Sequence, residues 1–158
     1  MSKEQENIKV IKSFFDSFLR GEVLSAVDRC FAPDVEYTSV GTQSQETIDA
    51  IPWSGFFRGR EEIKQAFIAL GDSFEVLEFT PREYVAQDDA VAVFGSFRFR
   101  AVPTQRLVES DFAMNFRLYH GQITRYLFFE NTYAVVLGFR HSGTWEIENV
   151  GRRRRVPA

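Results

Sequence analysis

The sequence IPWSGFFRGREEIKQAF, residues 51–67, places three large aromatic side chains, Trp53, Phe56 and Phe57, directly before a helical pattern. The residues that follow recur at intervals of three and four, which predicts a helix over residues 60–70. A short connecting segment with so many aromatic side chains either packs onto this helix or lines a hollow. The residues alone leave both alternatives open.

The chain before this stretch predicts two helices and a strand. Residues 2–20 show an amphipathic helical pattern that opens with a capping box at Ser2, and residues 22–31 repeat the pattern over a shorter length. Residues 35–40, VEYTSV, alternate and are rich in β-branched side chains, which is typical of a strand. The polar residues 41–50 are expected to form a loop.

The second half of the chain is rich in strands. The runs typical of strands are residues 74–86, 90–101, 106–119 and 122–130. Turn residues separate them, so consecutive strands are expected to pair as an antiparallel meander. Asn131 is placed to cap a last short helix, TYAVVLGF. We therefore predict an α+β fold, in which three N-terminal helices pack on a strongly curved antiparallel sheet and form a cone that encloses a pocket.

The composition is that of one ordinary globular domain with an aromatic interior. The chain has 158 residues, of which 44% are hydrophobic and 17 are Phe. A net charge of −3 does not favour nucleic acid or membranes as partners. A single cysteine, Cys30, excludes an internal disulfide and favours a reducing compartment, so we expect the cytoplasm. The sequence has no metal-ligand spacing and no phosphate-binding loop, so no cofactor and no metal are expected.

Three passages then become recognisable together. They are FAPDVEYTSVG after the opening helices, PWSGFFRGREEIKQAF, and FRLYHGQITRYLFFENTYAV. Over about residues 5–138 the chain resembles the SnoaL-like branch of the NTF2-like superfamily, which includes ketosteroid isomerases and polyketide cyclases. The resemblance implies the cone fold, a mostly apolar pocket and commonly a homodimer. It places the domain at residues 1–140, followed by a C-terminal extension, residues 141–158, with a basic tail.

The basic tail is the run RRRR at residues 152–155. We expect it to be solvated or to contact the second subunit of a dimer, since the acidic residues outnumber the basic ones overall. Trp145 and Ile147 just before it could add an edge strand to the sheet or cover a partner's sheet. Arg58 and Arg60 are expected to face solvent, with Arg58 within reach of an acidic ligand as the alternative.

Strand parity and the resemblance together predict which residues face the pocket. In the last strand hydrophobicity does not distinguish the two faces, and the resemblance places Tyr126, Phe128 and Glu130 inward. The resemblance also tips Trp53 and Phe57 toward lining the mouth. The full set of expected ligand-binding residues is Phe14, Phe18, Tyr37, Ser39, Trp53, Phe57, Phe67, Ser110, Phe112, Met114, Phe116 and Phe128.

The positions that carry chemistry in the named relatives hold other residue types here. The tyrosine, the general base and the protonated aspartate of ketosteroid isomerases would fall at Phe14, near Ser39 and near Met114. The last aspartate of limonene epoxide hydrolase would fall near Phe128. None of these side chains can take over the corresponding role, so neither mechanism is expected.

Glu130 and Tyr126 remain as the catalytic candidates. A carboxyl group surrounded by Phe side chains loses hydration, so its pKa rises toward the range of a general acid or base. A tyrosine hydroxyl nearby could orient it or polarise a carbonyl. The structural alternative is that Glu130 bonds the first turn of the following helix or an arginine. We therefore expect a protein that binds a small, apolar, carbonyl-bearing molecule, with isomerase, cyclase or hydrolase chemistry at Glu130. The alternatives are a non-catalytic binding module or a structural dimer whose cavity is filled by its own side chains.

Overall fold

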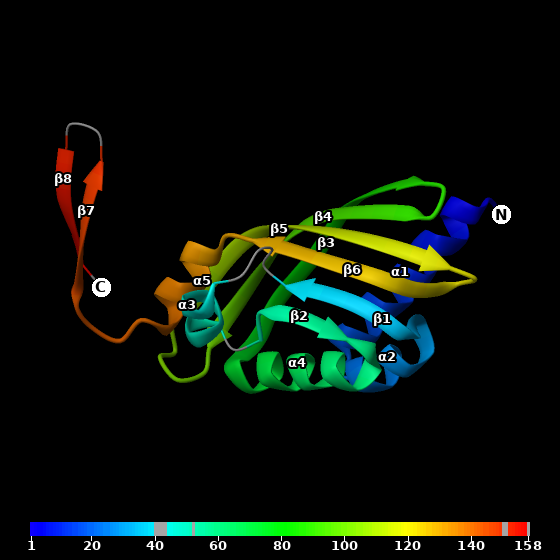
Figure 1. Cartoon of the computed structure of the whole chain (residues 1–158), viewed down its shortest axis with the longest axis horizontal. Helices are drawn as coiled ribbons and strands as arrows, with labels where there is room; N and C mark the ends of the chain where they lie inside the picture. Colours follow the sequence, from blue (N-terminus) through cyan, green and yellow to red (C-terminus); the bar gives the residue numbers. More distant parts are fainter. Residues whose placement is uncertain (40–43, 52, 150–151, 158) are drawn as a thin grey trace.

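A curved, unclosed sheet of six strands forms the body of the protein (Figure 1). The computed structural model describes residues 1–39, 44–51, 53–149 and 152–157, and the side chains among them as far as Gly143. The strands are β1 (Phe31–Ser39), β2 (Gly55–Arg58), β3 (Phe74–Gln87), β4 (Ala90–Ala101), β5 (Leu107–Tyr119) and β6 (Gln122–Glu130). They lie in the order β2-β1-β6-β5-β4-β3, so the meander expected from β3 to β6 is confirmed.

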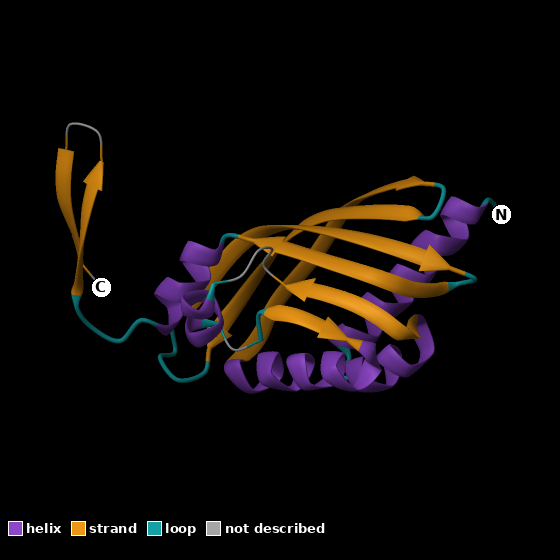
Figure 2. Ribbon diagram, viewed as in Figure 1, coloured by secondary structure: helices purple, strands orange, loops and turns teal. Residues whose placement is uncertain are grey.

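The two opening helices form as the sequence predicts. α1 (Lys3–Leu19) begins with the capping box of Ser2 and buries an aromatic and aliphatic stripe that includes Ile11, Phe14 and Phe15. α2 (Val23–Cys30) follows after Gly21, whose φ of +75° suits a residue without a side chain. In Figure 2, α1 crosses behind the strands of the sheet and α2 lies below them.

The third helix expected over residues 60–70 is present, but the description of three N-terminal helices is not confirmed. Only α1 and α2 precede the sheet, because the long helix α4 (Gly59–Ser73) comes after β1 and β2. The segment expected to be a loop contains a further short helix, α3 (Gln45–Ala50), whose first turn is capped by the side chain of Ser44. Phe56 and Phe57, two of the three aromatic residues before α4, lie in β2, an edge strand that pairs with β1.

The sheet is mixed and not purely antiparallel, which corrects the second part of the fold prediction. β1 pairs with β6 in a parallel register, with Tyr37 opposite Tyr126 and Ser39 opposite Phe128. Hydrophobic alternation within a strand does not encode its direction relative to a distant neighbour, so the sequence left this pairing undetermined. The parallel register places the carboxyl ends of β1 and β6 at the same end of the sheet.

A bulge in β3 brings aromatic side chains of neighbouring strands together inside the curve. The register of β3 with β4 shifts between Pro81 and Glu83, opposite Gly95. A side chain at Gly95 would collide with the backbone of Thr80 and with the ring of Phe112. The glycine therefore permits the close approach that a sharply bent sheet needs at this point.

The chain ends in α5 (Thr132–Phe139) and a separate hairpin, β7 (Thr144–Asn149) and β8 (Arg152–Pro157). Asn131 caps α5 as predicted, since its side-chain oxygen accepts a hydrogen bond from the backbone N–H of Ala134 at 3.2 Å. The hairpin lies away from the body of the molecule in Figure 1, and β7 pairs with β8, not with the six-stranded sheet. Within the described part of the chain, each helix is too short or too polar to cross a bilayer.

Candidate functional site

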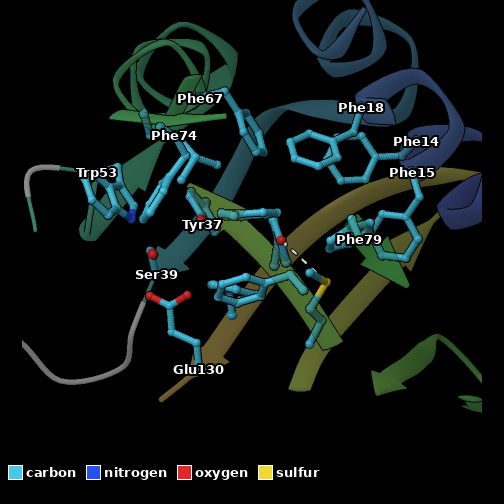
Figure 3. Close-up of a pocket in the computed structure, with 17 residues that line it drawn as sticks. Phe14, Phe15, Phe18, Tyr37, Ser39, Trp53, Phe67, Phe74, Phe79 and Glu130 are labelled. Carbon is cyan, nitrogen blue, oxygen red and sulfur yellow. Dashed lines mark hydrogen bonds between the residues drawn. The ribbon is translucent and has the colours of Figure 1, made fainter. Parts of the chain in front are cut away.

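A cavity of about 50 Å³ lies between α1, α4 and the inner face of the curved sheet (Figure 3). Its walls are almost entirely aromatic or aliphatic. Ten of the predicted site residues line it: Phe14, Phe18, Tyr37, Ser39, Trp53, Phe67, Met114, Tyr126, Phe128 and Glu130. The even-numbered positions of β6 thus face inward, at 126, 128 and 130.

Four predicted lining residues lie behind the wall instead of in it. The ring of Phe116 stacks under Tyr126 with centroids 4.6 Å apart, and Phe57 stacks behind Tyr37 at 5.7 Å. Phe112 stacks on Phe79 with centroids 5.0 Å apart and an interplanar angle of 5°. Strand parity identifies the buried face but does not indicate which buried rings shield others from the cavity.

Ser110, the fourth of these residues, forms two hydrogen bonds with backbone groups of the fold. Its hydroxyl donates to the carbonyl oxygen of Asp111 at 2.6 Å and accepts from the backbone N–H of Asn131 at 2.9 Å. It therefore fixes the start of α5 against β5 and is committed to the fold. Ser110 does not line this cavity, so its position gives no support to the predicted contact with a ligand.

Several residues that line the cavity were not predicted from the sequence. They are Phe15, Ala66, Leu70, Phe74, Phe79, Phe97 and Phe99. Parity would have found Phe97 and Phe99, because odd positions of β4 are buried throughout. The rings of these two residues stack with centroids 4.3 Å apart, so β4 contributes a continuous aromatic surface.

The three aromatic residues shortly before α4, Trp53, Phe56 and Phe57, occupy different positions in the fold. Trp53 is buried and lines the cavity, and its ring packs against Phe74 and Phe139 with centroids 5.0 Å and 5.3 Å away. Phe56 on β2 is 61% exposed and faces away from the core. Of the three aromatic residues, one therefore lines the hollow, Phe57 buttresses its wall, and the last is a surface residue of an edge strand.

The expectation that Arg60 faces solvent is wrong. Its guanidinium is half-buried and donates from Nε and Nη2 to the carbonyl oxygen of Phe31, at 2.9 Å and 2.6 Å. This bidentate contact ties the start of α4 to the start of β1. Arg58 is exposed as expected, and its backbone N–H donates to the carboxylate of Glu62.

Glu130 is the one lining residue, among those described, whose side chain can ionise near neutral pH. Burial raises the pKa of its carboxyl group from 4.5 to about 7. Its Oε1 atom is buried and has no hydrogen-bond partner among the described residues. Such an oxygen loses hydration without compensation, so it is chemically available to a molecule that enters the cavity.

The structural alternative requires Glu130 to bond the first turn of α5 or an arginine. Asn131 supplies the side chain that caps α5, and Ser110 accepts the backbone N–H of Asn131. Among the described residues no ion pair joins Glu130 to an arginine. The fold therefore satisfies the start of α5 without this carboxyl group.

Two buried tyrosines carry the other polar groups of the cavity. Burial raises the pKa of Tyr37, an effect that a hydrogen bond with Ser39 partly offsets and the charge of Glu130 increases. Burial also raises the pKa of Tyr126 well above its ordinary value, helped by Tyr37 and Glu130. Both hydroxyls therefore stay protonated at any physiological pH and act as hydrogen-bond donors. In Figure 3, the Ser39 hydroxyl and the Glu130 carboxyl group lie at the same end of the cavity.

The comparisons with known proteins agree with this architecture. The SnoaL-like domain family matches residues 11–126 of the chain. The chain belongs to this family. The match covers both opening helices in large part, the curved sheet as far as Tyr126, and most of the cavity-lining residues. No curated protein matches the chain.

Solved structures of SnoaL-like and NTF2-like proteins share the fold. An NTF2-like protein from Burkholderia xenovorans is 23% identical, covering 87% of this chain and 98% of its own, with a TM-score of 0.73. A protein provisionally described as a polyketide cyclase, from Xanthomonas campestris, is 16% identical and covers 88% of this chain and 100% of its own, with a TM-score of 0.71. TerC, co-crystallised with polyporic acid, is 22% identical and covers 82% and 95%, with a TM-score of 0.68. At these identities the likeness shows the fold alone.

The polar groups that line the cavity include one carboxyl group and three hydroxyl groups, those of Ser39, Tyr37 and Tyr126. Within the described residues, no three His, Cys, Asp or Glu side chains gather closely enough to hold a metal ion. Glu130 is a single carboxyl group in an aromatic surrounding. Such a group can give or take a proton near neutral pH without further assistance.

Proposed function

We propose that this SnoaL-like protein binds a small hydrophobic, carbonyl-bearing molecule in the cavity and transfers protons on it through Glu130. The observation that carries the proposal is the buried Oε1 atom of Glu130, which has no hydrogen-bond partner among the described residues. A pKa near 7 leaves both the acid and the carboxylate form populated at neutral pH. The aromatic walls favour an apolar ligand body, and the hydroxyls of Tyr37 and Tyr126 favour an oxygen acceptor on it.

The proposed step is removal of a proton from the carbon next to the carbonyl group. The Glu130 carboxylate takes this proton and the electron pair moves onto the carbonyl oxygen. The carboxyl group exchanges its proton with solvent and then reprotonates the enolate carbon. Tyr126 assists by donating a hydrogen bond to the oxygen as negative charge develops on it. Isomerisation and ring-closing reactions of carbonyl compounds share this step, so it tests the reaction class without knowledge of the natural substrate.

Acetophenone provides a direct assay, because exchange of its methyl protons in D₂O is visible by NMR. We expect the wild-type protein to accelerate this exchange, and Glu130→Gln to lower the acceleration by at least ~100-fold, the usual contribution of a general base. Glu83→Gln is the matched control, since Glu83 is an exposed residue of β3 outside the cavity lining. The proposal fails if Glu130→Gln exchanges protons as fast as wild type.

A non-catalytic binding module is the second candidate, and it is favoured by the absence of the catalytic residue types of ketosteroid isomerases at Phe14, Ser39 and Met114. The cavity, at about 50 Å³, is smaller than most ligand sites, so a ring-sized molecule must displace aromatic side chains to enter. Polyporic acid, the molecule in the TerC structure, is a second probe for this alternative. Binding of either probe with no proton exchange in any variant would favour the binding module.

We also propose that the protein acts as a homodimer through the outer face of the sheet. Phe94, Ala113 and Phe129 lie side by side across β4, β5 and β6, and both phenylalanines are more than 40% exposed. Along β5 this row separates the acidic Glu109 from the basic Arg117, so a second copy in reversed orientation brings opposite charges together. Analytical ultracentrifugation of Phe129→Lys is expected to show a monomer. An unchanged dimer would refute this interface.

A further inference from the structure

The hydroxyl of Tyr126 has an unusual partner for so buried a group. It donates to the thioether sulfur of Met114, with an oxygen–sulfur distance of 3.6 Å (dashed in Figure 3). Both residues are 4% exposed and both line the cavity. A thioether is a weak acceptor compared with a carbonyl or ether oxygen. The structure therefore places a strong donor against an acceptor that most ligand oxygens would outcompete.

The ring of Tyr126 is held so firmly that its hydroxyl has a fixed position. Tyr37 and Phe116 stack on its two faces, each with centroids 4.6 Å away and nearly parallel planes. The rings of Phe14 and Phe31 meet it in edge-on contacts at 6.4 Å. Four aromatic neighbours thus leave the hydroxyl little freedom to turn toward another acceptor by itself.

Met114 is the adaptable member of the pair. Its unbranched side chain has three rotatable bonds, and the residue lies on β5 next to Phe128 of β6, at the surface of the cavity. Rotation of its end moves the sulfur without disturbing the tyrosine ring. The geometry therefore allows a ligand oxygen to take over the hydrogen bond of Tyr126 while the thioether moves aside.

We propose that Tyr126 and Met114 form a selection device for ligands that carry an acceptor oxygen, a proposal that rests on the ligand-binding function given above. A ligand with a carbonyl oxygen gains a hydrogen bond from the fixed hydroxyl. A hydrocarbon of the same shape must leave Tyr126 on the sulfur, or displace the sulfur and leave the hydroxyl unpaired. The residue pair then determines which apolar molecules bind, whether or not Glu130 acts on them.

The experiment compares acetophenone with α-methylstyrene, which has the same planar shape and a CH₂ group in place of the oxygen. The ratio of their dissociation constants is measured for wild type, Tyr126→Phe and Met114→Leu by titration. We expect Tyr126→Phe to reduce the preference for acetophenone about tenfold relative to wild type. Met114→Leu removes the competing acceptor, so the preference is expected to rise above that of wild type. The two variants move in opposite directions, which a general loss of packing would not produce.

A second readout reports on the sulfur itself. The chain has two methionines, Met1 and Met114, so labelling the methionine methyl groups with ¹³C gives two assignable NMR signals. Acetophenone is expected to shift the Met114 signal in wild type much more than α-methylstyrene does. In Tyr126→Phe the difference between the two probes is expected to vanish.

The outcomes separate this inference from the proposed function. If both probes bind and the ratio is the same in all three proteins, the selection device is refuted while ligand binding stands. If neither probe binds to wild type, both proposals fail together. If the ratio changes as expected while no proton exchange occurs, the selection device stands and the catalytic role of Glu130 falls.

Discussion

The two ends of the cavity are built from the same strands and have opposite character. At the inner end, Tyr126 is enclosed by aromatic rings, among them Phe14, and its hydroxyl is satisfied by a sulfur atom. At the other end, four residues further along β6, Glu130 lies near Ser39 (Figure 3) and has a buried oxygen with no hydrogen-bond partner among the described residues. Because β1 and β6 run parallel, both strands deliver polar groups to the same end. One fold thus separates a packed core from a carboxyl group with an unsatisfied oxygen within a single cavity.

Removal of a ring at the inner end should have the largest effect on stability. Phe14 is 2% exposed and its ring contacts those of Phe15, Phe31, Phe67 and Tyr126. We expect Phe14→Ala to lower the free energy of unfolding by about 3–5 kcal/mol, because burial is lost and a void remains. Urea denaturation measures the change.

Phe56→Ala is the matched control, since this ring is 61% exposed on the edge strand β2. Its expected cost is below about 0.5 kcal/mol. Equal costs for Phe14→Ala and Phe56→Ala would contradict the view that the inner end is the packed core.

The carboxyl group of Glu130 should make the free energy of unfolding depend on pH. The folded-state pKa of about 7 lies above the ordinary 4.5, so between these values the folded protein binds more protons than the unfolded chain. The stabilisation of the folded protein by proton binding at Glu130 is fully present below pH 4.5 and is lost as pH rises to about 7. We expect Glu130→Gln to gain roughly 1–3 kcal/mol of stability relative to wild type over this interval.

Denaturation of both proteins at a series of pH values tests this prediction, because the other titrating groups cancel in the difference. A difference between wild type and Glu130→Gln that stays constant with pH would show that the carboxyl group is well solvated in the folded protein.

Loss of the hydrogen bond from Tyr126 to Met114 should change the free energy of unfolding least. Met114→Leu keeps the apolar volume but leaves the Tyr126 hydroxyl without its acceptor, at an expected cost of about 1–2 kcal/mol. The double variant Met114→Leu with Tyr126→Phe removes both partners and should recover part of that loss. A double-mutant cycle measures the coupling, and strictly additive effects would show that the sulfur contact contributes nothing to stability.

Much of the fold could be predicted because its signals are local. The capping box at Ser2, the turns between β3 and β6, and the cap at Asn131 are each encoded within a few residues. The parallel pairing of β1 with β6 joins segments about ninety residues apart and has no local signature. α3 and β2 are short, so their patterns are hard to distinguish from those of loops.

The candidate site could be predicted in part for similar reasons. Alternation along β5 identified Met114 as inward-facing, and the family resemblance selected Tyr126 and Glu130 on β6; all three line the cavity. Alternation also selected Phe116, which is buried behind Tyr126, because periodicity reports burial and not depth. The contact between the Arg60 guanidinium and the Phe31 carbonyl depends on how α4 meets β1, which a single segment does not reveal.

The ionisation of Glu130 is the property on which the proton-transfer account depends most. It can be measured by NMR on protein labelled with ¹³C at the glutamate carboxyl groups, with Glu130→Gln identifying the signal. We predict that this carboxyl group titrates with a pKa of about 7, above its ordinary value of 4.5. A titration midpoint near 4.5 would contradict this prediction, because Glu130 would then be an ordinary hydrated carboxylate and a weak base at neutral pH.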